Sequence, residues 1–249
     1  MLALIGGSGL SRLDGFDPVT QNKINTVFGE TSACLSIGKF ANKDIVFLPR
    51  HGNPHVVPPH KINYRANIWA LKDLGVQRII AVTAVGGITS FSSPGTIIIP
   101  HQIIDYTYGR ENTFFDGTVN SLEHIDFTQP YNFDLRTRLI EAAHKEKIKI
   151  IDGGVYAATQ GPRLETSAEI LRLENDGADI VGMTGMPEAS LAKEAGLAYA
   201  KISIVANWAA GKADSEQKIT VSDINSVIQG SIAKIKKIIS SYLNEENNG

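Results

Sequence analysis

The stretch that decides the fold reads Asp179-Ile180-Val181-Gly182-Met183-Thr184-Gly185-Met186-Pro187-Glu188. An apolar run gives way to a polar, glycine-containing loop, and a helical stretch follows over residues 187–195. A second apolar run, residues 198–206, ends on Asn207. This strand-helix-strand order is typical of α/β proteins, which bind ligands at the ends of their strands. The stretch therefore predicts a crevice that receives Thr184 and Asn207 from successive strands.

Outward from this stretch, short apolar runs alternate with segments of helical spacing. Strands are expected at residues 2–5, 44–48, 78–85, 96–99, 148–151 and 154–158, and helices at residues 63–74, 132–147, 165–176 and 222–243. Residues 105–131 are polar and aromatic without a clear period, which indicates a long excursion. No linker, repeat or charge block divides the chain, so the pattern predicts one α/β domain over residues 1–249, with a mixed twisted sheet flanked by helices.

Composition narrows the class of protein. The chain has 249 residues, a net charge of −2, and 43% hydrophobic and 20% charged residues, which is ordinary for a soluble globular protein. The sequence has no basic patch of the kind that binds nucleic acid. No apolar run approaches the roughly 20 residues of a membrane helix. The N-terminus lacks the basic stretch of a signal peptide, and Cys34 is the single cysteine. We therefore expect a cytoplasmic enzyme without disulfides or a thiolate metal cluster, although other reducing compartments also fit.

Two segments after predicted strands suit an anion. Gly6-Gly7-Ser8-Gly9 lets the backbone approach a ligand and adds the Ser8 hydroxyl, although it matches neither common nucleotide-binding motif and also fits a plain tight turn. Arg50-His51 places a planar fork of donors beside an imidazole, although an exposed Arg with a loop His fits as well. His51, His55 and His60 lie in a proline-rich loop without a carboxylate or Cys partner, so we expect no metal.

Two further residues suit a heterocycle. Asn207 both donates and accepts through its amide, which fits N7 and O6 of a 6-oxopurine. Glu165 is able to accept a hydrogen bond from the N1–H of such a ring. Each has a structural alternative, because Glu165 at a helix start complements the helix dipole and Asn207 fits a turn. Their occurrence together at successive strand ends favours a ligand site.

Taken together, these segments resemble the trimeric purine nucleoside phosphorylase and methylthioadenosine phosphorylase family over nearly the whole chain. The strongest stretches are Ile5-Gly6-Gly7-Ser8-Gly9-Leu10, Pro49-Arg50-His51-Gly52, Asn63-Tyr64-Arg65-Ala66-Asn67-Ile68-Trp69-Ala70-Leu71, Gly161-Pro162-Arg163-Leu164-Glu165-Thr166 and Gly182 to Glu188. The resemblance implies an enzyme that splits an N-glycosidic bond with inorganic phosphate as co-substrate, without a cofactor, and that assembles as a homotrimer.

The resemblance also implies roles for single residues. Ser8, Arg50, His51 and Thr184 are expected to bind phosphate, together with the backbone around Ala84. At that position the family often has a hydroxyl residue, which this chain lacks. Met183 is expected under the ribose, Asn207 at purine N7 and O6, and Glu165 at N1. Asn207 and His51 are the catalytic candidates. His124 matches a residue that the family lends to the neighbouring subunit's site.

Departures from the family pattern indicate the substrate. Methylthioadenosine phosphorylases place aspartates around Asn207 and Ala209, whereas the Glu165 and Asn207 pair resembles 6-oxopurine enzymes. Thr220-Val221 stands where those enzymes have a polar His for the ribose 5′-hydroxyl, and Val221 gives an apolar pocket that favours a 5′-methylthio group. Leu164 replaces the usual stacking Phe, with Trp208 as a possible substitute. The combination implies S-methyl-5′-thioinosine.

Other functions stay open from the sequence. A general inosine or guanosine phosphorylase needs only a roomier 5′ pocket, and a methylthioadenosine phosphorylase needs a different base pocket. A hydrolase works without phosphate. A non-catalytic nucleoside-binding module has no need of an anion site, and Arg50-His51 beside Thr184 argues against it.

Overall fold

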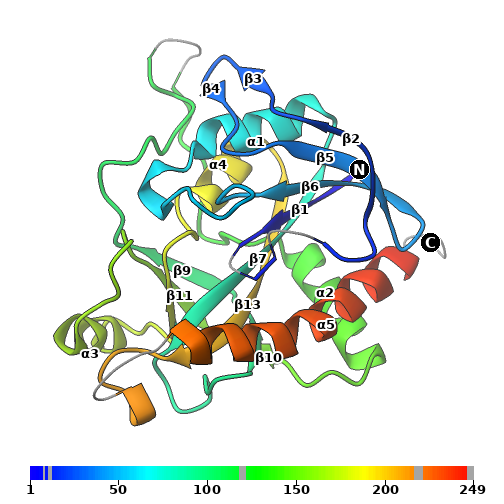
Figure 1. The fold of residues 1–249 in the computed structure, drawn as a ribbon. Helices are drawn as coiled ribbons and strands as arrows, with labels where there is room; N and C mark the ends of the chain where they lie inside the picture. The colour runs from blue at the N-terminus through cyan, green and yellow to red at the C-terminus, as the bar shows by residue number, and fades with distance from the viewer. Residues whose placement is uncertain (8, 11–12, 118–121, 216–220, 246–249) are drawn as a thin grey trace.

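A mixed, twisted sheet with helices packed around it forms the molecule (Figure 1). The computed structural model describes all residues except 8, 11–12, 118–121, 216–220 and 246–249, and the side chains of residues 221–225 are also left out. The strands are β1 (Leu2–Gly6), β2 (Asp17–Asn22), β3 (Asn25–Thr26), β4 (Gly29–Glu30), β5 (Leu35–Phe40), β6 (Lys43–Pro49), β7 (Arg78–Gly87), β8 (Ile97–Ile99), β9 (Gln102–Asp105), β10 (Ile151–Asp152), β11 (Val155–Ala158), β12 (Ile180–Gly182) and β13 (Ala198–Trp208). The helices are α1 (Tyr64–Asp73), α2 (Phe133–Lys145), α3 (Ser167–Asn175), α4 (Glu188–Glu194) and α5 (Val221–Glu245), with short 3₁₀ turns η1 (Pro59–Lys61) and η2 (Ala213–Ser215).

The strand order brings the predicted site segments together. The main sheet runs β10-β8-β13-β7-β1-β6-β5-β2, and β12, β11 and β9 extend in turn from β7. Strands β13, β7, β1 and β6 are parallel neighbours, whereas β12 pairs with the end of β7 in antiparallel register. The carboxyl ends of these four strands therefore meet at one edge of the sheet, where α/β proteins bind ligands. The predicted fold class is confirmed.

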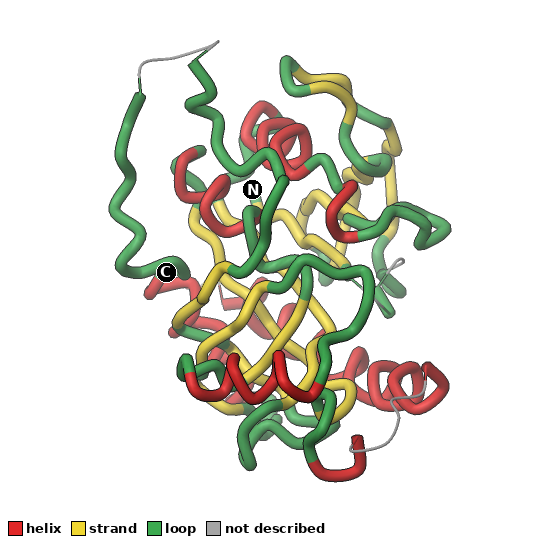
Figure 2. The backbone as a smooth tube through the Cα atoms, turned by 90° about the vertical axis from the view of Figure 1, so that its left-hand side faces the viewer, coloured by secondary structure: helices red, strands yellow, loops and turns green. Residues whose placement is uncertain are grey.

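Alternating side chains of the central strands pack against helices on opposite faces. Ile79 of β7 belongs to a core cluster with α1 and α4, and Ile80 belongs to a cluster with α2 and α5. This alternation is the period-2 pattern of a strand buried on both faces. Helix α3 packs against β11 and β12 through a third cluster (Figure 2). Helices on both faces leave the strand ends free to build a site.

The structure differs from the sequence prediction in places. The strand expected at residues 148–151 begins only at Ile151, because the Ile148 N–H donates to the Ala143 carbonyl at 2.9 Å and closes the last turn of α2. The edge strand β2 and its neighbour β5 were not predicted; every residue of β2 is exposed, so β2 carries no apolar period. The predicted long excursion is confirmed, since the described residues between β9 and α2 contain no helix or strand.

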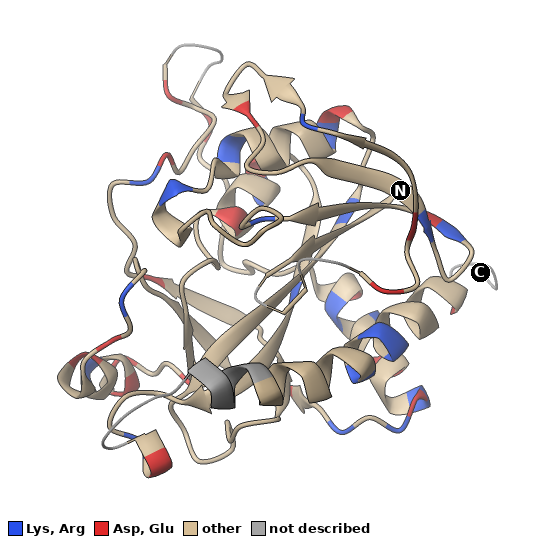
Figure 3. Cartoon of the chain, in the orientation of Figure 1, with Lys and Arg blue, Asp and Glu red and all other residues tan. Residues whose placement is uncertain are grey.

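Charged residues surround the sheet rather than forming one block. Lys and Arg are interspersed with Asp and Glu on the outer helices and loops, and the central strands carry few of either (Figure 3). None of the helices in the described part of the chain has both the length and the apolar character that a bilayer crossing requires.

Candidate active site

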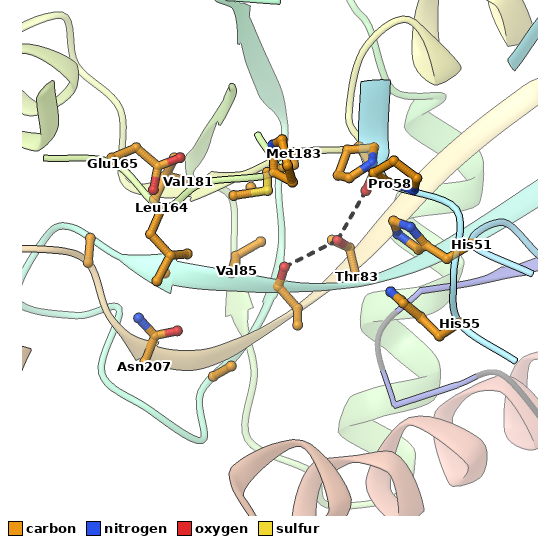
Figure 4. A pocket seen from close by; sticks show the side chains of 18 of the residues that line it. His51, His55, Pro58, Thr83, Val85, Leu164, Glu165, Val181, Met183 and Asn207 are labelled. Atoms are coloured by element: carbon orange, nitrogen blue, oxygen red, sulfur yellow. Dashed lines mark hydrogen bonds between the residues drawn. The ribbon is translucent and has the colours of Figure 1, made fainter. Parts of the chain in front are cut away.

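A cleft of about 430 Å³ opens at the carboxyl ends of β7 and β13. Most of the predicted site residues line it: His51, Ala84, Leu164, Glu165, Met183, Thr184, Asn207 and Ala209. Figure 4 shows the two ends of the cleft. Glu165, Leu164 and Asn207 lie at one end, His51 and His55 lie at the other, and Met183 lies between them. The sequence prediction of a crevice shared by successive strand ends is confirmed by this arrangement.

His51 is fixed in one tautomer. Its Nδ1 lies 2.8 Å from the carbonyl oxygen of Val57, and a carbonyl only accepts, so Nδ1 carries the proton. Burial and the neighbouring Arg50 charge lower the pKa of His51 to about 4. The ring is therefore neutral near pH 7, and its Nε2 lone pair is left for a ligand. The ring of His55 stacks on it with centroids 4.2 Å apart.

Two threonine hydroxyls lie next to the histidine end. The Oγ1 atoms of Thr83 and Thr184 are 3.4 Å apart, and both residues are buried and line the cleft. From the sequence, only backbone groups and no hydroxyl were expected near Ala84. Thr83, one residue earlier on β7, supplies a hydroxyl, and it was missed because it stands within an apolar run. This end of the cleft therefore offers two rotatable donors to an anion.

Arg50 is buried beside the cleft in an ion pair. Its side chain is fully buried, and its Nε and Nη2 donate to the two carboxylate oxygens of Glu188 at 2.8 and 2.9 Å. Its Nη1 donates to the Val82 carbonyl at 2.9 Å. A Cβ at Gly7 would lie 2.8 Å from this Nη1, so glycine permits the close approach. Arg50 is not among the residues that line the cleft, and phosphate contact by its remaining N–H groups stays a prediction.

Glu188 is the centre of a buried polar group. Besides Arg50, it accepts a hydrogen bond of 2.7 Å from the Tyr199 hydroxyl. Burial alone would raise the pKa of Glu188, but the charges of Arg50 and Lys201 hold it below its usual value. Lys201 is itself buried, and desolvation lowers its pKa to about 7. The ion pair that holds Arg50 was not predicted from the sequence.

The opposite end of the cleft is more open. The Thr159 hydroxyl donates to one oxygen of Glu165 at 2.6 Å, which leaves the second oxygen for a ligand. The register of β13 against β7 shifts between Val205 and Asn207, and such a bulge re-aims the side chain that follows it. The Asn207 amide donates to the Trp208 carbonyl at 2.6 Å. Leu164, 47% exposed, leaves space beside both polar groups.

Besides Arg50, four predicted residues are not among those that line the cleft. Trp208 ends β13 outside the cleft lining, and His124 is exposed in the excursion. Ser8 lies outside the described residues, and Val221 begins α5 with its side chain also outside them. Among the described residues, no three His, Cys, Asp or Glu side chains gather as metal ligands do.

Comparison with known proteins identifies the family. The model of the phosphorylase superfamily matches residues 2–244. A probable S-methyl-5'-thioinosine phosphorylase of Pseudomonas syringae pv. tomato is 49% identical over 97% of this chain and 97% of its own length. The 6-oxopurine nucleoside phosphorylase of Pyrococcus furiosus is 43% identical over 96% of this chain and 90% of its own length.

A solved structure has the same fold. Methylthioadenosine phosphorylase from Schistosoma mansoni in complex with adenine superposes with a TM-score of 0.94 and 33% identity, covering 100% of this chain and 92% of the other. The chain thus belongs to the phosphorylase superfamily and is an enzyme, as the resemblance implied.

Proposed function

We propose that this chain is a 6-oxopurine nucleoside phosphorylase that prefers S-methyl-5′-thioinosine and releases hypoxanthine and 5-methylthioribose 1-phosphate. One observation carries the proposal. A single cleft joins a heterocycle end, with Glu165 and Asn207, to an anion end, with His51 and Thr184. A nucleoside with phosphate beside its C1′ needs both ends at once.

The heterocycle end supports a 6-oxopurine. The unbonded oxygen of Glu165 suits the N1–H donor that hypoxanthine presents. The Asn207 amide, which donates to the Trp208 carbonyl, suits N7 and O6 after a side-chain rotation. Among the described residues that line the cleft, Glu165 is the one carboxylate, so none faces a 6-amino group from the β13 side.

The anion end supports inorganic phosphate. Because His51 is neutral and protonated at Nδ1, its Nε2 accepts the single O–H of hydrogen phosphate. The hydroxyls of Thr83 and Thr184 then donate to unprotonated oxygens, with Arg50 expected to add the charge. This arrangement orients an unprotonated oxygen for attack, and phosphate is a co-substrate rather than a cofactor.

The reaction follows from these positions. The C1′–N9 bond breaks with its electron pair leaving on the purine, and positive charge develops on the sugar. Bound phosphate stabilises that charge and forms the new C1′–O bond. Asn207 stabilises the negative charge near N7, and the purine then takes a proton from water. Met183 is expected to pack under the ribose, and no metal or covalent intermediate is needed.

The names of similar proteins and two residues of this chain support the 5′-methylthio preference and the trimer. Relatives at 49% and 45% identity carry the name probable S-methyl-5'-thioinosine phosphorylase, and Val221 predicts an apolar 5′ pocket. His124 is exposed in the single chain, and the family resemblance implies that this residue completes the site of a neighbouring subunit. We therefore propose a homotrimer, which sedimentation equilibrium tests directly.

The deciding experiment measures free base released from methylthioinosine, inosine, methylthioadenosine and adenosine, with and without phosphate. Hypoxanthine released mainly from methylthioinosine, and only with phosphate, supports the proposal. Comparable release from inosine indicates a general 6-oxopurine phosphorylase, and release mainly from adenine nucleosides contradicts the roles of Glu165 and Asn207. Release without phosphate indicates a hydrolase, and binding without turnover indicates a binding module.

A further inference from the structure

Arg110 lies in the long excursion and donates to main-chain carbonyls from two other segments. Its Nη1 donates to the carbonyls of Met183 at 2.9 Å and Met186 at 2.6 Å. Its Nη2 donates to the carbonyls of Thr159 at 3.1 Å and Gln160 at 2.8 Å, and its Nε donates to the Gln160 side-chain oxygen at 3.1 Å. These bonds use all five N–H groups of the guanidinium.

The carbonyls that Arg110 binds belong to loops at the cleft. The Met183 loop follows β12 and carries Thr184, the hydroxyl at the anion end. The Thr159 loop follows β11, and the Thr159 hydroxyl holds Glu165 at the heterocycle end. Strands β11 and β12 are parallel neighbours, so their carbonyls leave the sheet side by side. One planar group therefore fixes the spacing between the two loops.

A third contact reaches the remaining wall of the cleft. Arg110 Nη1 lies 3.3 Å from the Tyr64 hydroxyl, which itself donates to the Pro59 carbonyl at 3.0 Å. Pro59 lines the cleft beside the His51 loop. The described partners of Arg110 are carbonyl, amide and hydroxyl oxygens, whereas Arg50, Arg136 and Arg163 each pair with a carboxylate. Arg110 thus acts on loop geometry rather than on a charged partner.

We propose that Arg110 is a positioning residue for the reaction, which sets the separation of Thr184 and Glu165 and so of the phosphate from the purine. This inference rests on the proposed function. Arg110 is absent from the cleft lining, so its effect passes through the two loops. A lysine in its place keeps the charge but offers three donors from one point, which cannot span both loops.

The test compares Arg110→Gln and Arg110→Lys with a matched control, Arg172→Gln. Arg172 is on α3 with its side chain 73% exposed and pairs with Asp176 four residues on. Both Arg110 variants should lose about 100-fold in kcat/KM, for methylthioinosine and for phosphate alike, the effect of a misplaced reacting group. Millimolar guanidinium should restore part of the activity of Arg110→Ala and leave Arg172→Ala unchanged.

The outcomes separate the two proposals. Wild-type kinetics in folded Arg110→Gln overturn the positioning role alone, whereas a wild-type enzyme that releases no base from any nucleoside overturns the proposed function. Circular dichroism establishes folding, and if Arg110→Gln does not fold, Arg110→Lys is judged by the same kinetic criterion. An equal response of both alanine variants to guanidinium also contradicts the proposal.

Discussion

The two ends of the cleft are built differently. At the anion end, His51, Thr83 and Thr184 are 6%, 4% and 3% exposed and are bonded to one another or to backbone. At the heterocycle end, Glu165 and Asn207 are half-buried and Leu164 is 47% exposed. A preorganised, water-poor site strengthens electrostatic contacts to an anion. Under the proposed function, phosphate, the co-substrate common to all nucleosides, binds at the more buried end. The base, which differs between nucleosides, binds at the more open end.

The largest expected effect comes from breaking the support of the rigid end. Glu188→Gln leaves the Arg50 charge buried without a carboxylate, which should lower the free energy of unfolding by about 3–5 kcal/mol. Glu169→Gln is the matched control, since Glu169 also binds an arginine through both oxygens but at the surface. It should cost about 1 kcal/mol, including its part in the α3 capping box. Urea unfolding measures both, and equal losses would contradict the buried pair's importance.

The next effect tests the open end. Asn207→Ala removes the group proposed to stabilise the departing purine, and kcat should fall about 10²–10³-fold, equivalent to about 2.7–4 kcal/mol. Steady-state kinetics with methylthioinosine measure this fall in kcat. Unfolding free energy should change little, because Asn207 makes its one described side-chain bond to the adjacent Trp208 carbonyl.

A second substitution at the same position sharpens the comparison. Asn207→Asp replaces the donor with a carboxylate and should move selectivity toward aminopurine nucleosides. The ratio of kcat/KM for methylthioadenosine over methylthioinosine reports the shift, and an unchanged ratio would refute the contact of Asn207 with N7 and O6.

A smaller effect is expected in the pH dependence of the free energy of unfolding, to which His51 at the anion end contributes. His51 has a pKa of about 4 when folded and an ordinary value of 6.5, so the unfolded chain binds more protons in that interval. Its neutral, buried state therefore contributes stability fully above pH 6.5, and this contribution is lost as the pH falls toward 4. Between pH 7 and pH 5 the loss should be about 2 kcal/mol.

Comparing wild type with His51→Gln isolates that loss. The variant should lose about 2 kcal/mol less between the two pH values, whereas His144→Gln, at an exposed site on α2, should follow wild type. Urea titrations at each pH supply the free energies. Parallel curves for wild type and His51→Gln would show that the ring is not held neutral.

The difference between the ends also marks what the sequence could reveal. The segments around Asn207, Glu165 and Thr184 follow strands, so local patterns alone placed them at one sheet edge. Arg50 was recognised as chemically suited to phosphate, but its ion pair joins residues 138 positions apart, and no local pattern encodes such a pairing. Thr83 was hidden for the opposite reason, since a single threonine in an apolar run also fits an ordinary buried strand.

Arg110 shows the same limit in another form. Its partners are backbone carbonyls of Met183, Met186, Thr159 and Gln160, and main-chain groups leave no residue signature in a sequence. It also stands in a segment without periodicity, where side chains are not assigned to a face. The fold was therefore predictable from strand and helix patterns, whereas the contacts that support the site appear only in the three-dimensional structure.

The smallest expected effect concerns the stacking surface at the open end. Leu164→Phe places an aromatic ring where Leu164 is 47% exposed and lines the cleft, so the added atoms enter open space. Stacking on the purine should contribute about 0.5–1.5 kcal/mol, lowering KM for methylthioinosine roughly 2- to 10-fold without changing KM for phosphate. Leu171→Phe, 56% exposed on α3 and outside the cleft lining, should leave both constants unchanged. A fall in both constants in Leu164→Phe would mean that the two ends are coupled rather than separately built.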